Sequence, residues 1–272
     1  MAPNLGTSLE VATATDPGMV RSHNEDSIAI DGEIGLAVLA DGMGGYNAGE
    51  VASGIAAELI KVEMKKSLDG KSPRELNTPY AEQLITQHAK QANAAIYHGS
   101  QSQPQYSGMG TTLVVALWHD NQISVGHVGD SRLYRLRGGA LEQITRDHSL
   151  LQEQIDSGMI TKEQARHSQN KNLVTRAVGI DPEVETEVHT YPVQVGDIYL
   201  MCSDGLNDMV TDEDIQTTLS SLAANLPLAA KQLVQLACDN GGRDNVSVIL
   251  VRVVKEFPAH TGLVDKLKTW FR

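Results

Sequence analysis

The chain has 272 residues and carries 34 acidic against 22 basic side chains, a formal net charge of −12 with histidine neutral. This excess of negative charge disfavours binding to nucleic-acid phosphates or to an anionic membrane surface, so we expect neither partner. Apolar residues make up 41% of the sequence, which is enough for a sizeable core in one domain.

Neither end of the chain nor its cysteines indicate an extracellular protein. The first ten residues lack a basic segment followed by an apolar run, and no stretch approaches the ~18 consecutive apolar residues of a membrane span. Cys202 and Cys238 are far apart and form no disulfide framework or CxxC spacing. We therefore expect a cytoplasmic protein without a membrane span.

Short segments rich in Val, Ile and Leu predict β-strands, which cluster in two blocks of the sequence. Several connections are short and turn-like, as at Asp120-Asn121, and this favours antiparallel hairpins. The expected strands are 8–15, 27–30, 35–40, 111–118, 122–128, 132–136, 198–202 and 246–254.

Apolar residues at helical spacing predict helices at 49–66, at about 79–98, after Thr211 and at about 226–239. Ser72-Pro73-Arg74-Glu75 has the pattern of a capping box and predicts a further helix start. Residues 147–176 form a helical insertion, with Thr161 as a cap inside it, whose composition suits a mobile flap. Antiparallel strands in two groups with helix pairs outside them predict an α+β fold, a four-layer α/β/β/α sandwich.

Three carboxylates stand at the ends of predicted strands, beside glycines. Asp41 and Asp204 each follow an apolar strand, and Asp244 precedes the last one. One Asp-Gly pair is more typical of a turn, but three converging carboxylates would repel one another without cations between them. The set therefore indicates a site for hard divalent cations.

Two further segments carry charges near predicted strands. Arg21-Ser22-His23-Asn24-Glu25-Asp26 combines a guanidinium, which can bind phosphate through two hydrogen bonds, with acids that can bind metal-bound water. In isolation this segment is more typical of a polar loop. Asp130 in Gly129-Asp130-Ser131 lies between two strands, where a tight hairpin explains it equally well.

Taken together, these segments resemble the PPM, or PP2C-like, family of metal-dependent protein phosphatases, particularly its bacterial single-domain members. The resemblance spans about residues 8–254 and implies a catalytic domain at 1–256, with the flap at about 147–176. Residues 257–272 would form a tail, with a short amphipathic helix as one alternative. The segments that carry the resemblance are Arg21 to Asp26, Ala40-Asp41-Gly42-Met43-Gly44-Gly45, Gly110-Thr111-Thr112, Val128-Gly129-Asp130-Ser131-Arg132, Thr145-Arg146-Asp147-His148-Ser149, Ser203-Asp204-Gly205 and Gly242-Arg243-Asp244-Asn245.

The resemblance implies Mn²⁺ or Mg²⁺ as the cofactor, with two ions and a weaker third. Asp41 would bridge the two ions, and the Gly42 carbonyl would complete the coordination of one of them. Asp204 and Asp244 would hold the other ion. Asp130, together with Asp204, would bind the third.

The resemblance also assigns roles around the ions. Glu25 and Asp26 would act through metal-bound water, Asn245 would support the ligands, and Arg21 would bind the phosphoryl oxygens. Two cations roughly 3.5–4 Å apart can activate a bridging hydroxide for direct attack on phosphorus.

The proton donor to the leaving group is not identified by the resemblance. Animal relatives place a histidine where this chain has Met43. His148 and His167 lie in or beside the flap and are candidates, although a single histidine is more often a surface or structural residue.

The implied function is hydrolysis of phosphoserine and phosphothreonine in proteins phosphorylated by a serine/threonine kinase, by a monomeric enzyme. The alternative is a regulatory pseudophosphatase that binds phosphoproteins without turnover. Such a protein should lack some of the metal carboxylates, and all three are present here. A metallonuclease also uses two metal ions, but the acidic charge argues against it.

Overall fold

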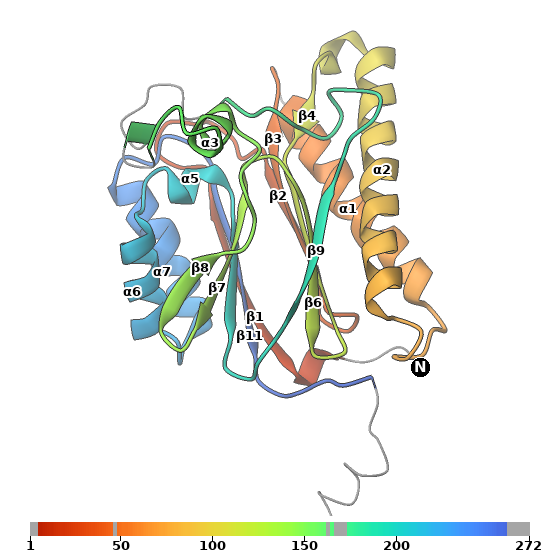
Figure 1. Cartoon of the computed structure of the whole chain (residues 1–272). Helices are drawn as coiled ribbons and strands as arrows, with labels where there is room; N and C mark the ends of the chain where they lie inside the picture. Colours follow the sequence, from red (N-terminus) through yellow and green to blue (C-terminus); the bar gives the residue numbers. More distant parts are fainter. Residues whose placement is uncertain (1–4, 46–47, 162–163, 166–172, 260–272) are drawn as a thin grey trace, which may run out of the picture.

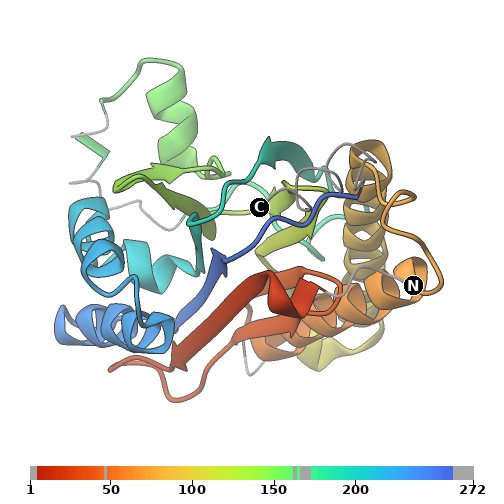
Figure 2. The same ribbon diagram turned by 90° about the horizontal axis from the view of Figure 1, so that it is seen from below.

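The computed structural model describes residues 5–45, 48–161, 164–165 and 173–259. Two β-sheets face each other in the middle of the molecule, and helices cover the outer face of each sheet (Figures 1 and 2). The expected α+β fold with four layers is confirmed.

The first sheet has five strands in the spatial order β1-β11-β10-β7-β8, and every neighbouring pair is antiparallel. Helices α6 and α7 pack on its outer face, where their apolar sides meet the strands in one core. The bounds are β1 (Leu9–Asp16), β7 (Arg132–Arg137), β8 (Ala140–Gln143), β10 (Ile198–Cys202), β11 (Val246–Val253), α6 (Asp212–Ser221) and α7 (Leu226–Asp239).

The second sheet has the order β2-β3-β5-β6-β9, and the short strand β4 pairs with the end of β3. Its outer face is covered by α1 and α2. The bounds are β2 (Asp26–Asp31), β3 (Leu36–Met43), β4 (Gly110–Thr111), β5 (Leu113–His119), β6 (Gln122–Val128), β9 (Glu187–Pro192), α1 (Ala48–Leu68) and α2 (Thr78–Ser102). Shorter helices are η1 (Leu5–Thr7), η2 (Pro104–Tyr106), α3 (Leu150–Asp156) and α5 (Asp204–Asn207).

The central strands are buried on both faces, so alternate side chains enter two different cores. In β3, Ala37 and Leu39 pack between the two sheets, while Val38 and Ala40 pack against α1 and α2. This explains the continuous apolar run that precedes Asp41, because a strand covered on both sides has no water-facing positions. The core on both sides fixes the strand end that carries Asp41.

Most predicted strands are present, and none of their ends differs from the prediction by more than three residues. The segment 111–118 is instead divided into β4 and β5, because Thr112 turns its amide and hydroxyl toward Asp41. β8 and β9 were not predicted from the sequence. Both lie at sheet edges and carry charged or polar side chains, so they lack the apolar run that reveals a central strand.

The helix start predicted at Ser72 is wrong. The Ser72 amide and hydroxyl do bind the Glu75 carboxylate, at 2.8 and 2.9 Å, but this pair closes a turn. Helix α2 starts later, where the Asn77 side chain accepts the amide of Tyr80 at 3.0 Å. The cap at Thr211 is confirmed, since its hydroxyl accepts the amide of Asp214 at 3.2 Å.

Of the predicted flap, the described part contains α3 and a second capped turn. The Thr161 hydroxyl accepts the amide of Gln164 at 3.2 Å, as expected for a cap. At the other end of the chain, Phe257 is buried against the core between the sheets. The helix considered for the tail falls almost wholly on residues 260–272, outside the described part. None of the helices in the described ranges has the length and apolar character needed to cross a bilayer.

Candidate metal and phosphate site

The sheet registers bring the acidic motifs to one edge of the sandwich. In the second sheet, Asp41 at the end of β3 lies directly opposite Asp26 at the start of β2. In the first sheet, β10 ends beside the start of β11, so the segments that carry Asp204 and Asp244 are neighbours. Helix α5, which begins at Asp204, and strand β4 both lie at the top of the sandwich in Figure 1.

Two glycines allow the backbone to close tightly around this edge. A Cβ atom on Gly205 would lie 2.0 Å from the carbonyl oxygen of Asn245, which would force the Asp204 and Asp244 segments apart. A Cβ atom on Gly42 would lie 2.2 Å from the carbonyl oxygen of Gly49 in α1. The glycines after Asp41 and Asp204 therefore meet a packing requirement as well as a turn requirement.

The backbone of Asp41 is held on both sides by threonines. Its amide donates to Thr112 Oγ1 at 3.0 Å, and its carbonyl accepts the Thr111 hydroxyl at 2.8 Å and the Thr112 amide at 2.8 Å. Thr112 Oγ1 also lies 2.7 Å from Ser131 Oγ, next to Asp130. These hydroxyls connect the Asp41 strand end to the Asp130 turn and leave the Asp41 side chain to face the other carboxylates.

Asp26 shows how the two sheets meet at the site. One of its carboxylate oxygens, Oδ2, accepts the hydroxyl of Ser203 at 2.8 Å, although Ser203 directly follows β10 of the opposite sheet. The other oxygen, Oδ1, is buried and has no protein partner. A buried carboxylate oxygen without a donor is unfavourable unless a cation or a bound water satisfies it. The residues therefore fit a cation site.

The electrostatics of the acidic cluster also indicate a cation site. Burial raises the pKa values of Asp41 and Asp204 well above the ordinary range, and the neighbouring carboxylates raise them further. Burial likewise raises the pKa of Asp26 to about 6 and that of Asp130 to about 6. The carboxylates that raise the pKa of Asp41 are Asp26, Asp204, Asp130 and Asp244. A divalent cation among them would offset both the burial and the mutual repulsion that raise these pKa values.

The N-terminal loop is fixed to the site by Asn245. Its Oδ1 accepts the amide of Glu25 at 2.8 Å, and its Nδ2 donates to the carbonyl oxygens of Pro17 at 3.0 Å and His23 at 2.9 Å. This places Glu25 at the site, where burial raises its pKa. Asn245 thus positions the loop through three hydrogen bonds.

Arg21 lies at the mouth of the site. Its Nη2 donates to Asp244 Oδ2 at 2.7 Å, and about half of its side chain is exposed. A guanidinium held at the rim with free donors can bind phosphoryl oxygens that approach from solvent.

A cavity of about 400 Å³ continues from the acidic cluster toward the flap. Asp130 and Asp204 line this cavity, together with Ile155 of α3 and Val210. The cavity places the flap helix beside the candidate third-ion ligands.

Of the two histidines considered as proton donors, the structure describes only His148. His148 is buried, with one ring nitrogen accepting the amide of Gly129 at 3.2 Å and the other 3.4 Å from Glu187. Both nitrogens are thus engaged by groups outside the acidic cluster. His167 lies outside the described residues. The proton donor is not identified.

Comparisons with known proteins agree with this arrangement. The family model described as Protein phosphatase 2C matches residues 20–237. The serine/threonine phosphatase stp of Listeria monocytogenes is 36% identical over 241 residues, which cover 87% of this chain and 93% of that protein.

Solved structures are equally similar. The crystal structure of the Mycobacterium tuberculosis serine/threonine phosphatase PstP/Ppp matches with a TM-score of 0.81 and 37% identity, over 91% of this chain and 100% of that one. The catalytic domain of PstP in complex with two manganese ions matches with a TM-score of 0.79 and 37% identity, over 91% and 99%. The chain belongs to the protein phosphatase 2C family.

Proposed function

We propose that this protein is a metal-dependent phosphatase that hydrolyses phosphoserine and phosphothreonine in proteins. The observation that carries the proposal is the convergence of Asp26, Asp41, Asp204 and Asp244 at one sandwich edge, with an unpartnered carboxylate oxygen among them. Family membership and relatives named as serine/threonine phosphatases support it. Because all of these carboxylates are present, a pseudophosphatase is not favoured.

The metal ligands are those that the family resemblance implies, and a two-ion site is supported by the similar PstP domain, which was solved in complex with two manganese ions. Asp41 and the Gly42 carbonyl would hold one Mn²⁺ or Mg²⁺ ion, and Asp41, Asp204 and Asp244 the second. Asp130 with Asp204 would bind a weaker third ion. The ions supply an activated water and stabilise negative charge on the phosphoryl group.

The remaining residues bind and orient the phosphoryl group or hold other site residues in place. Arg21 would hold the phosphoryl oxygens at the mouth, which orients the phosphorus for direct attack without a phosphoenzyme. Asp26 and Glu25 would accept hydrogen bonds from metal-bound water, and Asn245 keeps Glu25 in place through its amide. We assign this machinery to a domain at 1–256 with the flap at about 147–176.

The proposal extends to the cellular setting. The substrates would be proteins phosphorylated by a serine/threonine kinase, with the enzyme acting as a monomer in the cytoplasm. The acidic surface is consistent with a protein that does not bind nucleic acid.

Metal removal tests the function directly. Protein stripped with a chelator should not hydrolyse a phosphothreonine peptide, and Mn²⁺ should restore the rate because the carboxylates then regain their cations. Phosphate release is measured before and after metal addition, with Ca²⁺ and Zn²⁺ as comparison ions. Full activity in excess chelator would contradict the proposal, and so would peptide binding without phosphate release at saturating Mn²⁺.

Replacement of Arg21 tests its assigned role. Arg21→Ala should raise the KM for the phosphopeptide by about tenfold, because a charge-assisted pair to phosphate contributes about 1.5–3 kcal/mol and water replaces part of it. Arg21→Lys should recover only part of this loss, since lysine cannot bind two oxygens at once. Arg74→Ala, which removes an exposed arginine of the 72–75 turn, is the matched control. An unchanged KM in Arg21→Ala would remove the phosphate-binding assignment.

A further inference from the structure

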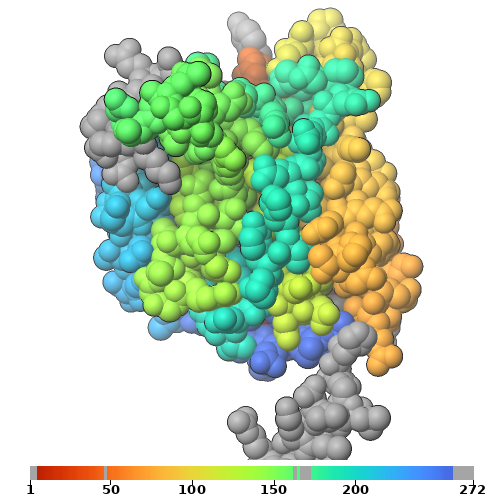
Figure 3. Space-filling view, in the orientation of Figure 1, coloured from red at the N-terminus to blue at the C-terminus, as the bar shows by residue number. Residues whose placement is uncertain are grey.

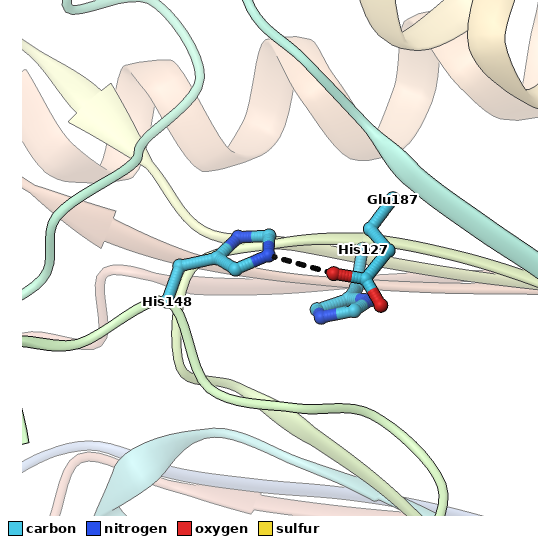
Figure 4. Close-up of side chains that lie close together, drawn as sticks. All are labelled: His127, His148 and Glu187. Atoms are coloured by element: carbon cyan, nitrogen blue, oxygen red, sulfur yellow. Dashed lines mark hydrogen bonds and ion pairs between the residues drawn. The ribbon is translucent and has the colours of Figure 1, made fainter. Parts of the chain in front are cut away.

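A second group of metal-ligating side chains lies apart from the acidic cluster. His127 near the end of β6, His148 just before α3 and Glu187 at the start of β9 each offer a ligand atom, and these atoms lie within 4.8 Å of one another (Figure 4). The three residues come from three separate segments and are brought together only by the tertiary fold. We call them the histidine cluster.

His127 is oriented in the way that metal-binding histidines are. Its Nε2 lies 2.8 Å from the carbonyl oxygen of Arg146, which can only accept, so Nε2 carries the proton. The lone pair is therefore on Nδ1. A ring nitrogen that donates to a backbone carbonyl fixes the ring and increases the basicity of the other nitrogen, as in known metal sites. The His127 side chain is buried, which fixes its orientation further.

His148 lies against His127, and the two rings are stacked with their centroids 4.7 Å apart and their planes at 19° to each other. Its Nε2 faces Glu187 Oε2 at 3.4 Å, while the other oxygen of Glu187 is 2.9 Å from His189. Burial lowers the pKa values of His127 and His148, so both are neutral imidazoles at pH 7, as metal binding requires. Burial opposes ionisation of Glu187, but hydrogen bonds from His189 and His148 outweigh it and lower its pKa.

We propose that the histidine cluster binds a borderline transition-metal ion of the zinc class, separate from the hard-cation site. Two imidazoles and one carboxylate form a ligand set that suits Zn²⁺, whereas Mg²⁺ and Mn²⁺ prefer oxygen ligands. The site opens to solvent on the side of Glu187, whose side chain is 35% exposed. Strand β9, which carries Glu187, lies at the surface of the face shown in Figure 3. A water molecule or His189 would complete four-coordination.

Metal binding here would change the turn that carries Asp130. The amide of Gly129 donates to Nδ1 of His148, so the neutral ring carries its proton on Nε2. An ion that binds Nε2 replaces this proton, and the ring then takes a proton on Nδ1. Two N–H groups would face each other, and the bond from Gly129 would be lost. Because Gly129 precedes Asp130, the occupied site shifts a residue next to the acidic cluster.

The test is a zinc titration of the full-length, Mn²⁺-loaded protein. Bound zinc is measured by equilibrium dialysis, and released manganese by electron paramagnetic resonance. The quantity compared is bound zinc minus released manganese, because zinc can also enter the acidic site. The expected result is one extra equivalent in the wild-type protein. Titration with Co²⁺ should give the visible absorption of a nitrogen-ligated ion.

Variants of the histidine cluster show where the extra equivalent of zinc binds. Glu187→Gln and His148→Gln should bind it at least about tenfold more weakly, since each removes a ligand and loss of an outer partner alone costs 10–100-fold. His88→Gln is the matched control, because His88 is a buried histidine in α2 that bonds to Ser67 and Gln91. Glu187 is partly exposed, so its variant is expected to fold, as circular dichroism would verify.

Two results would overturn the proposal. One is zinc uptake in the wild-type protein that is matched fully by manganese release, or no zinc uptake at all. The other is an extra equivalent that folded Glu187→Gln binds with wild-type affinity. Neither readout requires phosphatase activity, so this proposal and the proposed function can fail separately.

Discussion

Asp41→Asn is expected to lower phosphopeptide hydrolysis at saturating Mn²⁺ by more than about 100-fold, because loss of a partner one step further from a metal already costs 10–100-fold. Four neighbouring carboxylates act on Asp41, and it is the residue assigned to bridge the two ions. Asparagine has nearly the same shape but no negative charge, so it weakens metal binding with little change in packing. The measurement is the initial rate of phosphate release.

The stability of the same variant separates loss of a ligand from loss of the fold. Without metal, Asp41→Asn should be at least as stable as the wild-type protein, because it removes a buried acid whose neighbours repel its charge. Asp69→Asn changes another Asp-Gly pair at an exposed position and should leave rate and stability unchanged. A rate for Asp41→Asn within threefold of wild type would show that Asp41 is not a required ligand.

In metal-free protein, Asp130→Asn is expected to be more stable than wild type at pH 7.5 and equal to it near pH 4. Burial, together with the negative charge of Asp147, raises the pKa of Asp130 to about 6. A carboxyl with a raised folded-state pKa stabilises the fold below its unfolded pKa of about 4, and this stability is lost as the pH rises through about 6. The shift from 3.8 to about 6 corresponds to up to about 3 kcal/mol at pH 7.5.

Urea unfolding at pH 4, 6 and 7.5, after chelation and dialysis, measures this difference. Saturating Mn²⁺ should reduce or reverse it at pH 7.5, because Asp130 then contributes a ligand and metal bound only to the folded state stabilises it. Asp239→Asn, at the exposed C-terminal end of α7, serves as the comparison. Equal stability of Asp130→Asn and wild type at all three pH values would contradict the electrostatic account.

The parts of the fold that could be predicted from sequence are those whose local signal agrees with their environment. β6 and β10 have the predicted bounds, because each is a buried run that ends at a turn or at a glycine-flanked acid. β8 and β9 could not be recognised, since edge strands exposed to water need no apolar pattern. Ser72 shows the opposite case, in which a local capping pair forms but the helix starts elsewhere.

The candidate site also has parts that could be predicted from the sequence and parts that could not. Asp41 and Asp204 follow apolar strands and precede a glycine, Asp244 precedes the last strand, and the structure brings the three to one edge. The Ser203–Asp26 bond joins residues 177 positions apart from the two halves of the sandwich, so no local pattern reveals it. The histidine cluster could not be predicted either, because Glu187 lies in a strand that was not predicted and meets histidines from two other segments.

The bond from Ser203 to Asp26 links the two halves of the sandwich at the edge where the acidic residues gather. These acidic residues are likewise divided, with Asp26 and Asp41 on one sheet and Asp204 and Asp244 beside the strands of the other. An ion shared by Asp41 and Asp204 would therefore act as a removable cross-link between the halves of the sandwich. Loss of the ion would leave the two sheets freer to separate at this edge, so amide exchange at the ends of β3 and β10 should report metal occupancy without any substrate.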